Sequence, residues 1–212
     1  MNKKSIQVTA SILIIGNEIL SGRTQDANIA TLSKWLNTLG VKTKEVRVIP
    51  DIESIIIETV NNLRNNFNYV FTTGGIGPTH DDITAESISK AFNLSYEFHK
   101  DAFKILEEYY LPGEFNEGRQ KMSKMPANAK LILNPSSGAP GFFVENVFCL
   151  PGVPVILQSM LGGLKHAIVG GNPTLSDTIN LKTVESEIAK SLTKIQNDNN
   201  EVEIGSYPFF KA

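Results

Sequence analysis

Residues 69–78 read YVFTTGGIGP, a short run of β-branched and aromatic residues that ends in a glycine-rich loop. The apolar residues favour a strand over Tyr69–Thr73, the glycines end it, and a helical pattern follows from Thr84 to Phe92. Two similar units precede this one, each a strand followed by a helix: residues 6–15 with 27–39, and 41–49 with 52–67. This alternation predicts a three-layer α/β/α fold, a mostly parallel sheet with helices on both faces.

The remaining sequence adds two smaller parts. Two short helical patterns within residues 94–128 predict a small helical subdomain beside the sheet, with helices around 101–110 and 116–125. Strands are expected at 130–133, 142–145 and 147–150, and an apolar helix at 153–169. The tail predicts a small C-terminal α/β attachment, with a strand at 178–183, a helix at 185–196 and a strand at 202–206. We therefore expect a main domain over residues 1–170 and an attachment over 171–212.

Composition excludes several classes of protein. The chain has 212 residues, of which 41% are hydrophobic, and a formal net charge of −2, values typical of one globular domain with a small appendage. Such a charge offers no basic field for nonspecific nucleic-acid binding, so no nucleic-acid partner is expected. The single Cys149 excludes an internal disulfide, and the first residues lack a secretory signal pattern. We expect a cytoplasmic protein without a membrane span, since the most apolar stretch contains Lys165 and His166.

Polar motifs follow the strands at their carboxyl ends, where open parallel sheets bind ligands. In the loop after Thr73, three glycines remove side chains, so that successive N–H groups and the next helix N-terminus can bind an anion. This predicts a phosphate site, although a tight strand-to-helix turn is an alternative reason for the glycines. The candidate ligand-binding residues at three strand ends are Gly16, Asn17, Glu18, Thr73, Gly74, Gly75, Gly77, Pro78, Thr79, Pro151, Gly152 and Pro154.

Two adjacent acids, Asp81 and Asp82, come directly after this loop. Carboxylates repel a phosphate unless a divalent cation lies between them, and Mg²⁺ is bound by carboxylate and phosphate oxygens together. Asp81 and Asp82 are therefore candidate metal ligands and catalytic residues. The alternative for Asp82 is a helix cap, and Asp51, after the second strand, is either a cap or a further catalytic residue. His80 is expected to be a loop residue and Cys149 a small core residue.

Four motifs, in this order along the chain, resemble the MoaB/Mog-type molybdopterin-binding domain. They are residues 15–22 (IGNEILSG), 73–86 (TGGIGPTHDDITAE), 139–142 (APGF) and 151–154 (PGVP). Within that family the sequence is similar to the CinA (competence/damage-inducible protein A) branch and to the N-terminal domain of FAD synthase. The resemblance implies the three-layer fold, a glycine loop that holds a phosphate or a pterin, and functional roles for Asp51 and Asp82.

The resemblance also implies an activity, a metal and a ligand. CinA-type domains are associated with metal-dependent hydrolysis of nucleotide pyrophosphates such as ADP-ribose or FAD, which implies a divalent metal of the Mg²⁺ or Co²⁺ type. Members of the wider family bind or adenylylate molybdopterin, which makes this pterin a possible ligand. Two departures concern the substrate: Ile156 stands where CinA proteins usually carry a glutamate, and residues 134–138 (NPSSG) are closer to the FAD synthase type. Ser136, Ser137 and Gly138 are therefore further candidates for ligand binding.

Three functions remain open from the sequence. The leading hypothesis is a metal-dependent nucleotide pyrophosphatase, the second is molybdopterin binding or processing without pyrophosphatase activity, and the third is a noncatalytic nucleotide sensor. The resemblance implies a homo-oligomer, a dimer or trimer. Residues 94–128 add a physical motive, because they carry more aromatic and methionine surface than a small subdomain buries alone: Tyr109, Tyr110, Leu111, Phe115, Met122 and Met125.

Overall fold

The computed structural model describes residues 7–209 and divides the chain into two compact units, residues 1–174 and 175–212. The first unit is built on a six-stranded sheet in the order β2-β1-β3-β8-β7-β6. Its strands are β1 (Val8–Ile15), β2 (Val41–Ile49), β3 (Tyr69–Thr73), β6 (Lys130–Ile132), β7 (Gly141–Val144) and β8 (Val147–Leu150). The predicted strands are confirmed to within two residues at each end.

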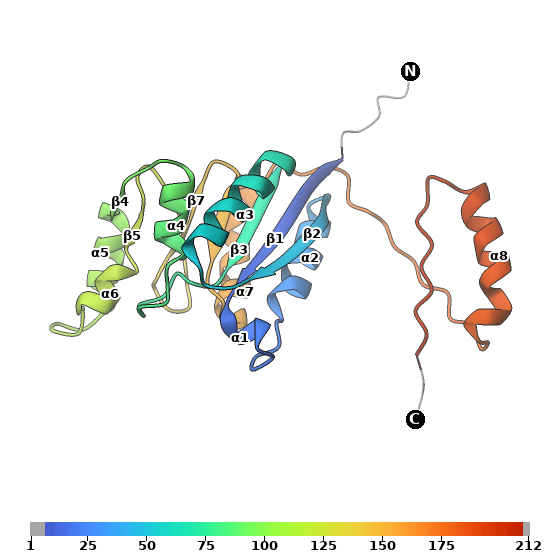
Figure 1. Ribbon diagram of the computed structural model, residues 1–212, viewed down its shortest axis with the longest axis horizontal. Coiled ribbons are helices and arrows are strands. Elements are labelled where there is room, and N and C mark those ends of the chain that lie inside the picture. Colours follow the sequence, from blue (N-terminus) through green and yellow to red (C-terminus); the bar gives the residue numbers. More distant parts are fainter. Residues whose placement is uncertain (1–6, 210–212) are drawn as a thin grey trace, which may run out of the picture. The chain divides into compact units, whose positions relative to one another are not determined.

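The sheet is mostly parallel, as predicted. β1 pairs in parallel with β2 and β3, and β3 pairs in parallel with β8, whereas β7 is antiparallel to both of its neighbours. The chain passes from β1 to β2 on one side and returns to β3 on the other, so the order reverses between β1 and β3. This is the switch point at which sheets of this kind bind ligands, at the carboxyl ends of the strands. Figure 1 shows α1 (Asn17–Leu20) at that edge, directly after β1.

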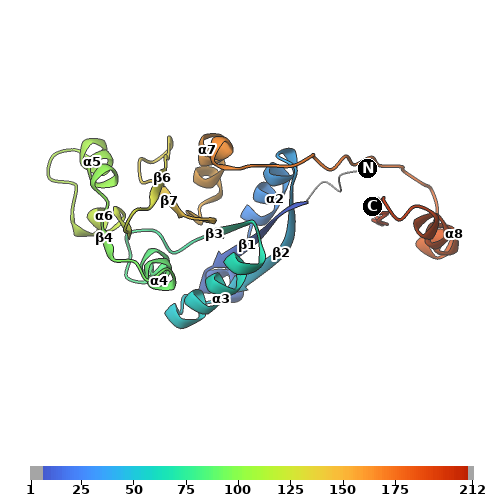
Figure 2. The same ribbon diagram turned by 90° about the horizontal axis from the view of Figure 1, so that it is seen from above.

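Helices cover both faces of the sheet. Figure 2 shows α2 (Asn28–Thr38) and α7 (Pro154–Leu164) on one side, and α3 (Glu53–Asn66) and α4 (Thr84–Ala91) on the other. The short 3₁₀ helix Lys165–Ala167 follows α7. This arrangement confirms the three-layer prediction.

The core consists of two apolar clusters, one on each face of the sheet. Alternate residues of β1 enter opposite clusters: Leu13 and Ile15 pack with α3 and α4, and Ile12 and Ile14 pack with α2 and α7. Cys149 is fully buried, as predicted, and burial raises the pKa of its thiol to about 12. A thiol held neutral in this way is a packing group.

Residues 96–126 form the subdomain beside the sheet, with α5 (Lys100–Tyr109) and α6 (Glu117–Lys121). The second helix is shorter than predicted, because the chain becomes extended at Lys124 and pairs β5 (Lys124–Pro126) with β4 (Tyr96–Phe98) in a two-stranded antiparallel sheet. Three-residue strands carry too little alternation to be recognised from sequence. Met125, expected on the surface, is instead buried in the core, so its place among the surface candidates is a correction.

The second unit contains α8 (Glu185–Asp198), close to the predicted helix. The strands expected at 178–183 and 202–206 are not formed in the described residues of this unit, up to 209. Both segments contain β-branched residues, but a strand also requires a backbone ladder, and neither segment has one. In the described part of the chain, every helix is too short or too polar to cross a bilayer.

Candidate functional site

Gly74 and Gly152, which follow β3 and β8, meet at the carboxyl ends of the three neighbouring strands β1, β3 and β8. The Gly74 N–H donates to the Leu150 carbonyl at 3.1 Å, and a Cβ added to Gly74 would lie 2.2 Å from the Ile15 carbonyl oxygen. A Cβ on Gly152 would lie 3.5 Å from the Gly74 Cα. The predicted strand ends therefore converge, and they leave a surface of bare backbone between them.

The glycine loop is fastened to the start of α4. The Thr84 N–H donates to the Gly75 carbonyl at 2.9 Å, and the Thr84 hydroxyl donates to the Gly74 carbonyl at 3.0 Å. Gly74 and Gly75 have φ values of +98° and +67°, and a Cβ on Gly75 would lie 2.1 Å from the Thr84 hydroxyl oxygen. Glycine alone adopts these positive φ values without strain and also leaves room for the Thr84 hydroxyl. The loop therefore sits on the positive end of a helix dipole, an arrangement suited to an anion.

The Asp81 and Asp82 carboxylates converge on one hydroxyl. Asp82 Oδ2 accepts from the Thr79 N–H at 2.8 Å and lies 2.6 Å from the Thr79 hydroxyl oxygen, and Asp81 Oδ1 lies 2.5 Å from the same oxygen. The Thr79 hydrogen bond lowers the pKa of Asp81, so this carboxyl is ionised at neutral pH. A hydroxyl has one proton to donate, so one of the two carboxylate contacts lacks a proton.

Neither Asp82 nor Asp51 caps the helix that follows it. Ile83 and Ile52 occupy the N-cap positions of α4 and α3, and neither helix start has a side-chain cap bond. The cap alternative for both acids is wrong. Asp51 instead accepts the Asn17 N–H at 2.9 Å and fixes the turn after β1, where the Glu18 carboxylate lies over Gly16.

A narrow cleft separates the glycine loop from the helical subdomain. Its volume is about 10 Å³, and its walls include Gly75, Gly77 and Asp82 on one side and Tyr96, Lys121 and Lys124 on the other. Burial raises the pKa of Tyr96 to about 12, with smaller effects from the Glu86 and Asp82 carboxylates, so its phenol stays neutral. None of these three subdomain residues could be predicted from the sequence, because no pattern in residues 94–128 indicates which side chains face the loop.

Two buried polar groups near the strand ends lack partners. Asn28, at the start of α2, is 3% exposed, and its Nδ2 donates to the Gly152 carbonyl at 2.8 Å while its Oδ1 has no hydrogen-bond partner. The Thr73 hydroxyl, at the end of β3, is also buried and unpartnered. An unsatisfied buried polar group costs about 1–3 kcal/mol, so both atoms would gain from a partner, which reaches them only after the surrounding loops move. Thr73 is one of the predicted ligand-binding residues, whereas Asn28 belongs to the polar segment 16–28, which is longer than a minimal turn but gave Asn28 no role of its own.

Ser136, Ser137 and Gly138 lie in a loop organised by Asn134. Its side-chain oxygen accepts the N–H groups of Ser136 and Ser137 at 3.0 and 3.1 Å, and its Nδ2 contacts the Ser137 hydroxyl at 2.8 Å. Gly138 packs against the ring of Tyr109 on α5. The walls of the cleft do not include these three residues.

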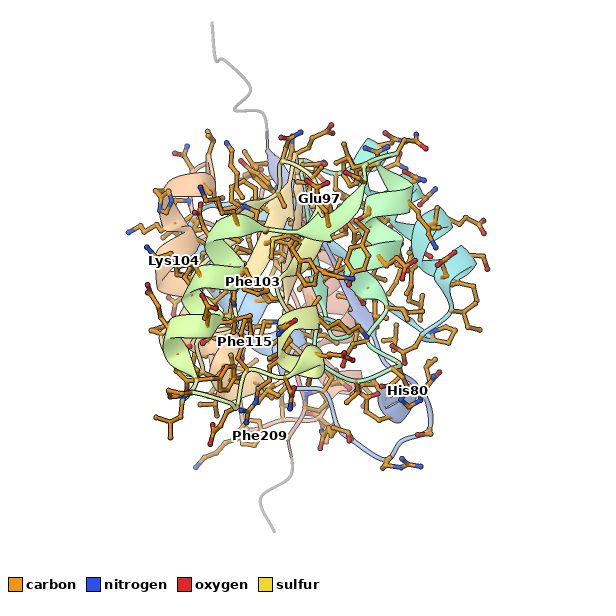
Figure 3. All side chains as sticks on the ribbon, turned by 90° about the vertical axis from the view of Figure 1, so that its left-hand side faces the viewer. His80, Glu97, Phe103, Lys104, Phe115 and Phe209 are labelled. Atoms are coloured by element: carbon orange, nitrogen blue, oxygen red, sulfur yellow. The ribbon has the colours of Figure 1, made fainter. Side chains whose placement is uncertain are left out.

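Two other predicted ligand-binding residues, Pro154 and Pro78, have packing roles. Pro154 occupies the first turn of α7, where proline fits because its missing N–H has no partner in the helix. Pro78 packs near Gly118 of α6. The His80 side chain is 98% exposed, in agreement with a loop residue, and Figure 3 shows it apart from the neighbouring Phe103 and Phe115 of the subdomain.

Comparison with known proteins places this geometry in a family. Residues 11–170 match the family model described as "Probable molybdopterin binding domain". The chain belongs to this molybdopterin-binding domain family. The model of the FAD synthase middle domain matches residues 173–212, a range that includes the second unit of this chain.

Relatives and solved structures agree with this membership. A protein of Archaeoglobus fulgidus is 35% identical over 197 residues, which cover 93% of this chain and 84% of that protein. The crystal structure of CinA from Thermoplasma acidophilum, a protein described there as of unknown function, is 30% identical with a TM-score of 0.71 and covers 75% of this chain and 96% of that one. MoaB from Thermus thermophilus, at 14% identity and a TM-score of 0.51, covers 76% and 91% respectively and shares the fold. The chain is thus a CinA-like member of the molybdopterin-binding domain family.

For a member of this family, the donor set of the site can be tested against a divalent cation. Within residues 7–209, no group of three or more His, Cys, Asp and Glu side chains is arranged to hold a metal. Mg²⁺, however, is usually bound by one or two carboxylates together with substrate phosphates. Asp81, Asp82 and the Thr79 hydroxyl offer hard oxygen donors beside an anion-binding loop. The residues fit such a cation in the presence of a phosphate ligand.

Proposed function

We propose that this chain hydrolyses a nucleotide pyrophosphate of the ADP-ribose or FAD type in a metal-dependent reaction. The observation that carries the proposal is the convergence of the Asp81 and Asp82 carboxylates on the single Thr79 hydroxyl, at 2.5 and 2.6 Å. A proton shared by the two acids would relieve their repulsion, but the pKa of Asp81 is lowered. Solvent, His80 and Lys121 offset part of the charge of Asp81, and a divalent cation is a further way to offset two carboxylates held at one hydroxyl.

Each part of the site has a defined task in this proposal. The backbone N–H groups of the glycine loop and the start of α4 bind one phosphate, and the Gly74 backbone is held between β1 and β8 so that it does not move. Asp82 fixes the loop through the Thr79 N–H, and Asp51 fixes the opposite turn through the Asn17 N–H. A bound divalent cation would neutralise charge on the phosphate and lower the pKa of a water molecule.

An assay of product formation tests the proposal. The protein is incubated with ADP-ribose or FAD in the presence of Mg²⁺ or Co²⁺, and AMP is measured by chromatography. We expect AMP with at least one of these pairs, and none after chelation. Absence of AMP with every substrate and metal would contradict pyrophosphatase activity. Thermal stabilisation by nucleotides without any turnover would instead support the noncatalytic sensor.

Molybdopterin binding is the second candidate, and the unpartnered oxygen of Asn28 favours it. This buried acceptor lies beside the Gly152 backbone, and it could accept an N–H from a pterin ring once the loop that covers it opens. Binding by Asn28 and the glycine loop requires no metal. Pterin binding that persists in a chelator, with no AMP from any nucleotide, would favour this candidate over hydrolysis.

We also propose that the chain forms a homo-oligomer through the outer face of the helical subdomain. Tyr109 and Leu111 remain 52% and 68% exposed there, although Met125 does not contribute. The mass in solution tests this assembly. A monomer at micromolar concentration would count against it.

A further inference from the structure

The helical subdomain presents two lysines to the glycine loop. Lys121 is the last residue of α6, and Lys124 is the first residue of β5. Both line the cleft opposite Gly75 and Gly77, although they belong to elements more than 40 residues further along the chain. The Lys121 ammonium donates to the Thr79 carbonyl, and the Lys124 ammonium lies 4.7 Å from the centre of the Phe98 ring.

Neither of these ammonium groups is paired with a carboxylate among the residues that the structure describes. Other lysines nearby are paired: Lys90 lies 2.6 Å from Glu53 and 2.9 Å from Glu86, and Lys104 lies 3.7 Å from Glu108. Asp82 lines the same cleft and the charge of Lys121 lowers the pKa of Asp81, so these carboxylates offset part of the lysine charge without forming an ion pair with either ammonium. Two such cations facing peptide N–H groups are an arrangement that attracts an anion.

The two walls of the cleft would bind different phosphates of such an anion. The Gly74 N–H is used by the Leu150 carbonyl, so the N–H groups of Gly75, Ile76 and Gly77 are the ones left in the glycine loop for one phosphate. The lysines come from the opposite wall, so a second phosphate of the same ligand would face them. Asp82 lines the same cleft, and its negative charge would disfavour a second phosphate unless cations on the other wall offset it.

We propose that Lys121 and Lys124 form a subsite for the second phosphate and make the chain selective for diphosphate over monophosphate ligands. This inference rests on the proposed function, since it takes the glycine loop as the site of the first phosphate. The cleft has room for about one water at its present volume of about 10 Å³, so α6 must shift outward when a ligand enters. Lys121 then exchanges a neutral carbonyl for a phosphate oxygen, which accepts a stronger, charge-assisted bond.

A purely structural role for Lys121 is the alternative, because its bond to the Thr79 carbonyl holds the loop that carries both acids. The two roles differ in their effect on ligands of different charge. A structural lysine supports the loop for every ligand, so its loss would weaken monophosphates and diphosphates alike. A phosphate-binding lysine contributes only to the ligand that reaches it.

The experiment compares ADP with AMP, which share the base and the ribose and differ by one phosphate. Dissociation constants for the full-length protein are measured by calorimetry in a chelator and again with Mg²⁺, for the wild type and for Lys121→Gln and Lys124→Gln. We expect the wild type to prefer ADP, and each variant to lower that preference by about three- to tenfold with AMP affinity nearly unchanged. Lys121→Arg keeps the charge and should retain most of the preference.

Lys104→Gln is the matched control, because Lys104 lies in the same subdomain and is paired on the outer surface of α5. It should leave the ADP-to-AMP preference unchanged, and thermal unfolding verifies that each variant is folded. Equal losses for ADP and AMP, or an unchanged preference in Lys121→Gln and Lys124→Gln, would overturn this inference alone. Failure of the wild type to bind either nucleotide, both in a chelator and with Mg²⁺, would overturn the glycine-loop site of the proposed function, and this inference with it.

Discussion

Single residues determine what the glycine loop can bind. Gly74 is the clearest case, since its φ of +98° and the Ile15 carbonyl 2.2 Å from an added Cβ both exclude a side chain. We expect Gly74→Ala to lower the free energy of unfolding by more than about 2 kcal/mol, because it combines left-handed strain with a backbone clash. Chemical denaturation measures this loss.

Gly162→Ala is the matched control for that substitution. Gly162 lies in α7 with nothing within 4 Å of an added Cβ and without a positive φ. Alanine should therefore stabilise the protein, by up to about 1 kcal/mol, since it has the better helix propensity. Equal effects of the two substitutions would contradict the role assigned to the Gly74 backbone.

Thr79 is a second case at the scale of a single residue, because its hydroxyl controls the ionisation of Asp81. Its hydroxyl lowers the pKa of Asp81, so this carboxylate stays charged further into acid than an ordinary aspartate. Removing the hydroxyl in Thr79→Val should raise the pKa of Asp81 and shift its protonation to higher pH, whereas Thr79→Ser should preserve the low value. Carboxyl NMR titration provides the comparison. No difference between the two variants would show that the hydrogen bond is not formed in solution.

At the scale of secondary-structure elements, the order of the strands explains why the residues of the candidate site lie close together. β1, β3 and β8 are neighbours and parallel, so their carboxyl ends lie at one edge. The pattern of apolar strands was sufficient to predict a mostly parallel sheet with polar motifs at the strand ends, but not the order of the strands. The alternation of strand and helix repeats over many residues, and a long periodic signal is difficult to misread. The roles of Asp82 and Asp51 were harder to predict, because sequence position alone does not distinguish a helix cap from a side chain that binds a loop N–H.

The subdomain was the least predictable element. Its β4 and β5 strands have three residues each, and Lys121 and Lys124 reach the cleft only because α6 ends where it does. Such contacts depend on tertiary packing between distant segments, for which local periodicity carries no information. The same reason applies to the tail, where extended apolar residues have strand propensity but no ladder partner in the described residues of its unit.

At the scale of the whole molecule, the first unit holds both apolar clusters, whose buried residues all lie between Ala10 and Ile168. Residues 1–174 should therefore fold without the second unit and unfold cooperatively at nearly the same temperature as the full chain. Calorimetry of the truncated protein checks this prediction. A broad transition, or a midpoint lower by about 10 °C or more, would indicate that the second unit supports the sheet.

The most direct measurement compares AMP release from ADP-ribose or FAD by the wild type, Asp82→Asn and Asp82→Ala, with Mg²⁺ or Co²⁺. An asparagine oxygen can still accept the Thr79 N–H, so Asp82→Asn should remain folded but lose activity by orders of magnitude, because it removes an anionic metal ligand. Asp82→Ala should also lose about 1 kcal/mol of stability with that hydrogen bond. Full activity in Asp82→Asn, with its fold intact, would contradict a metal held by this acid and the hydrolysis built on it.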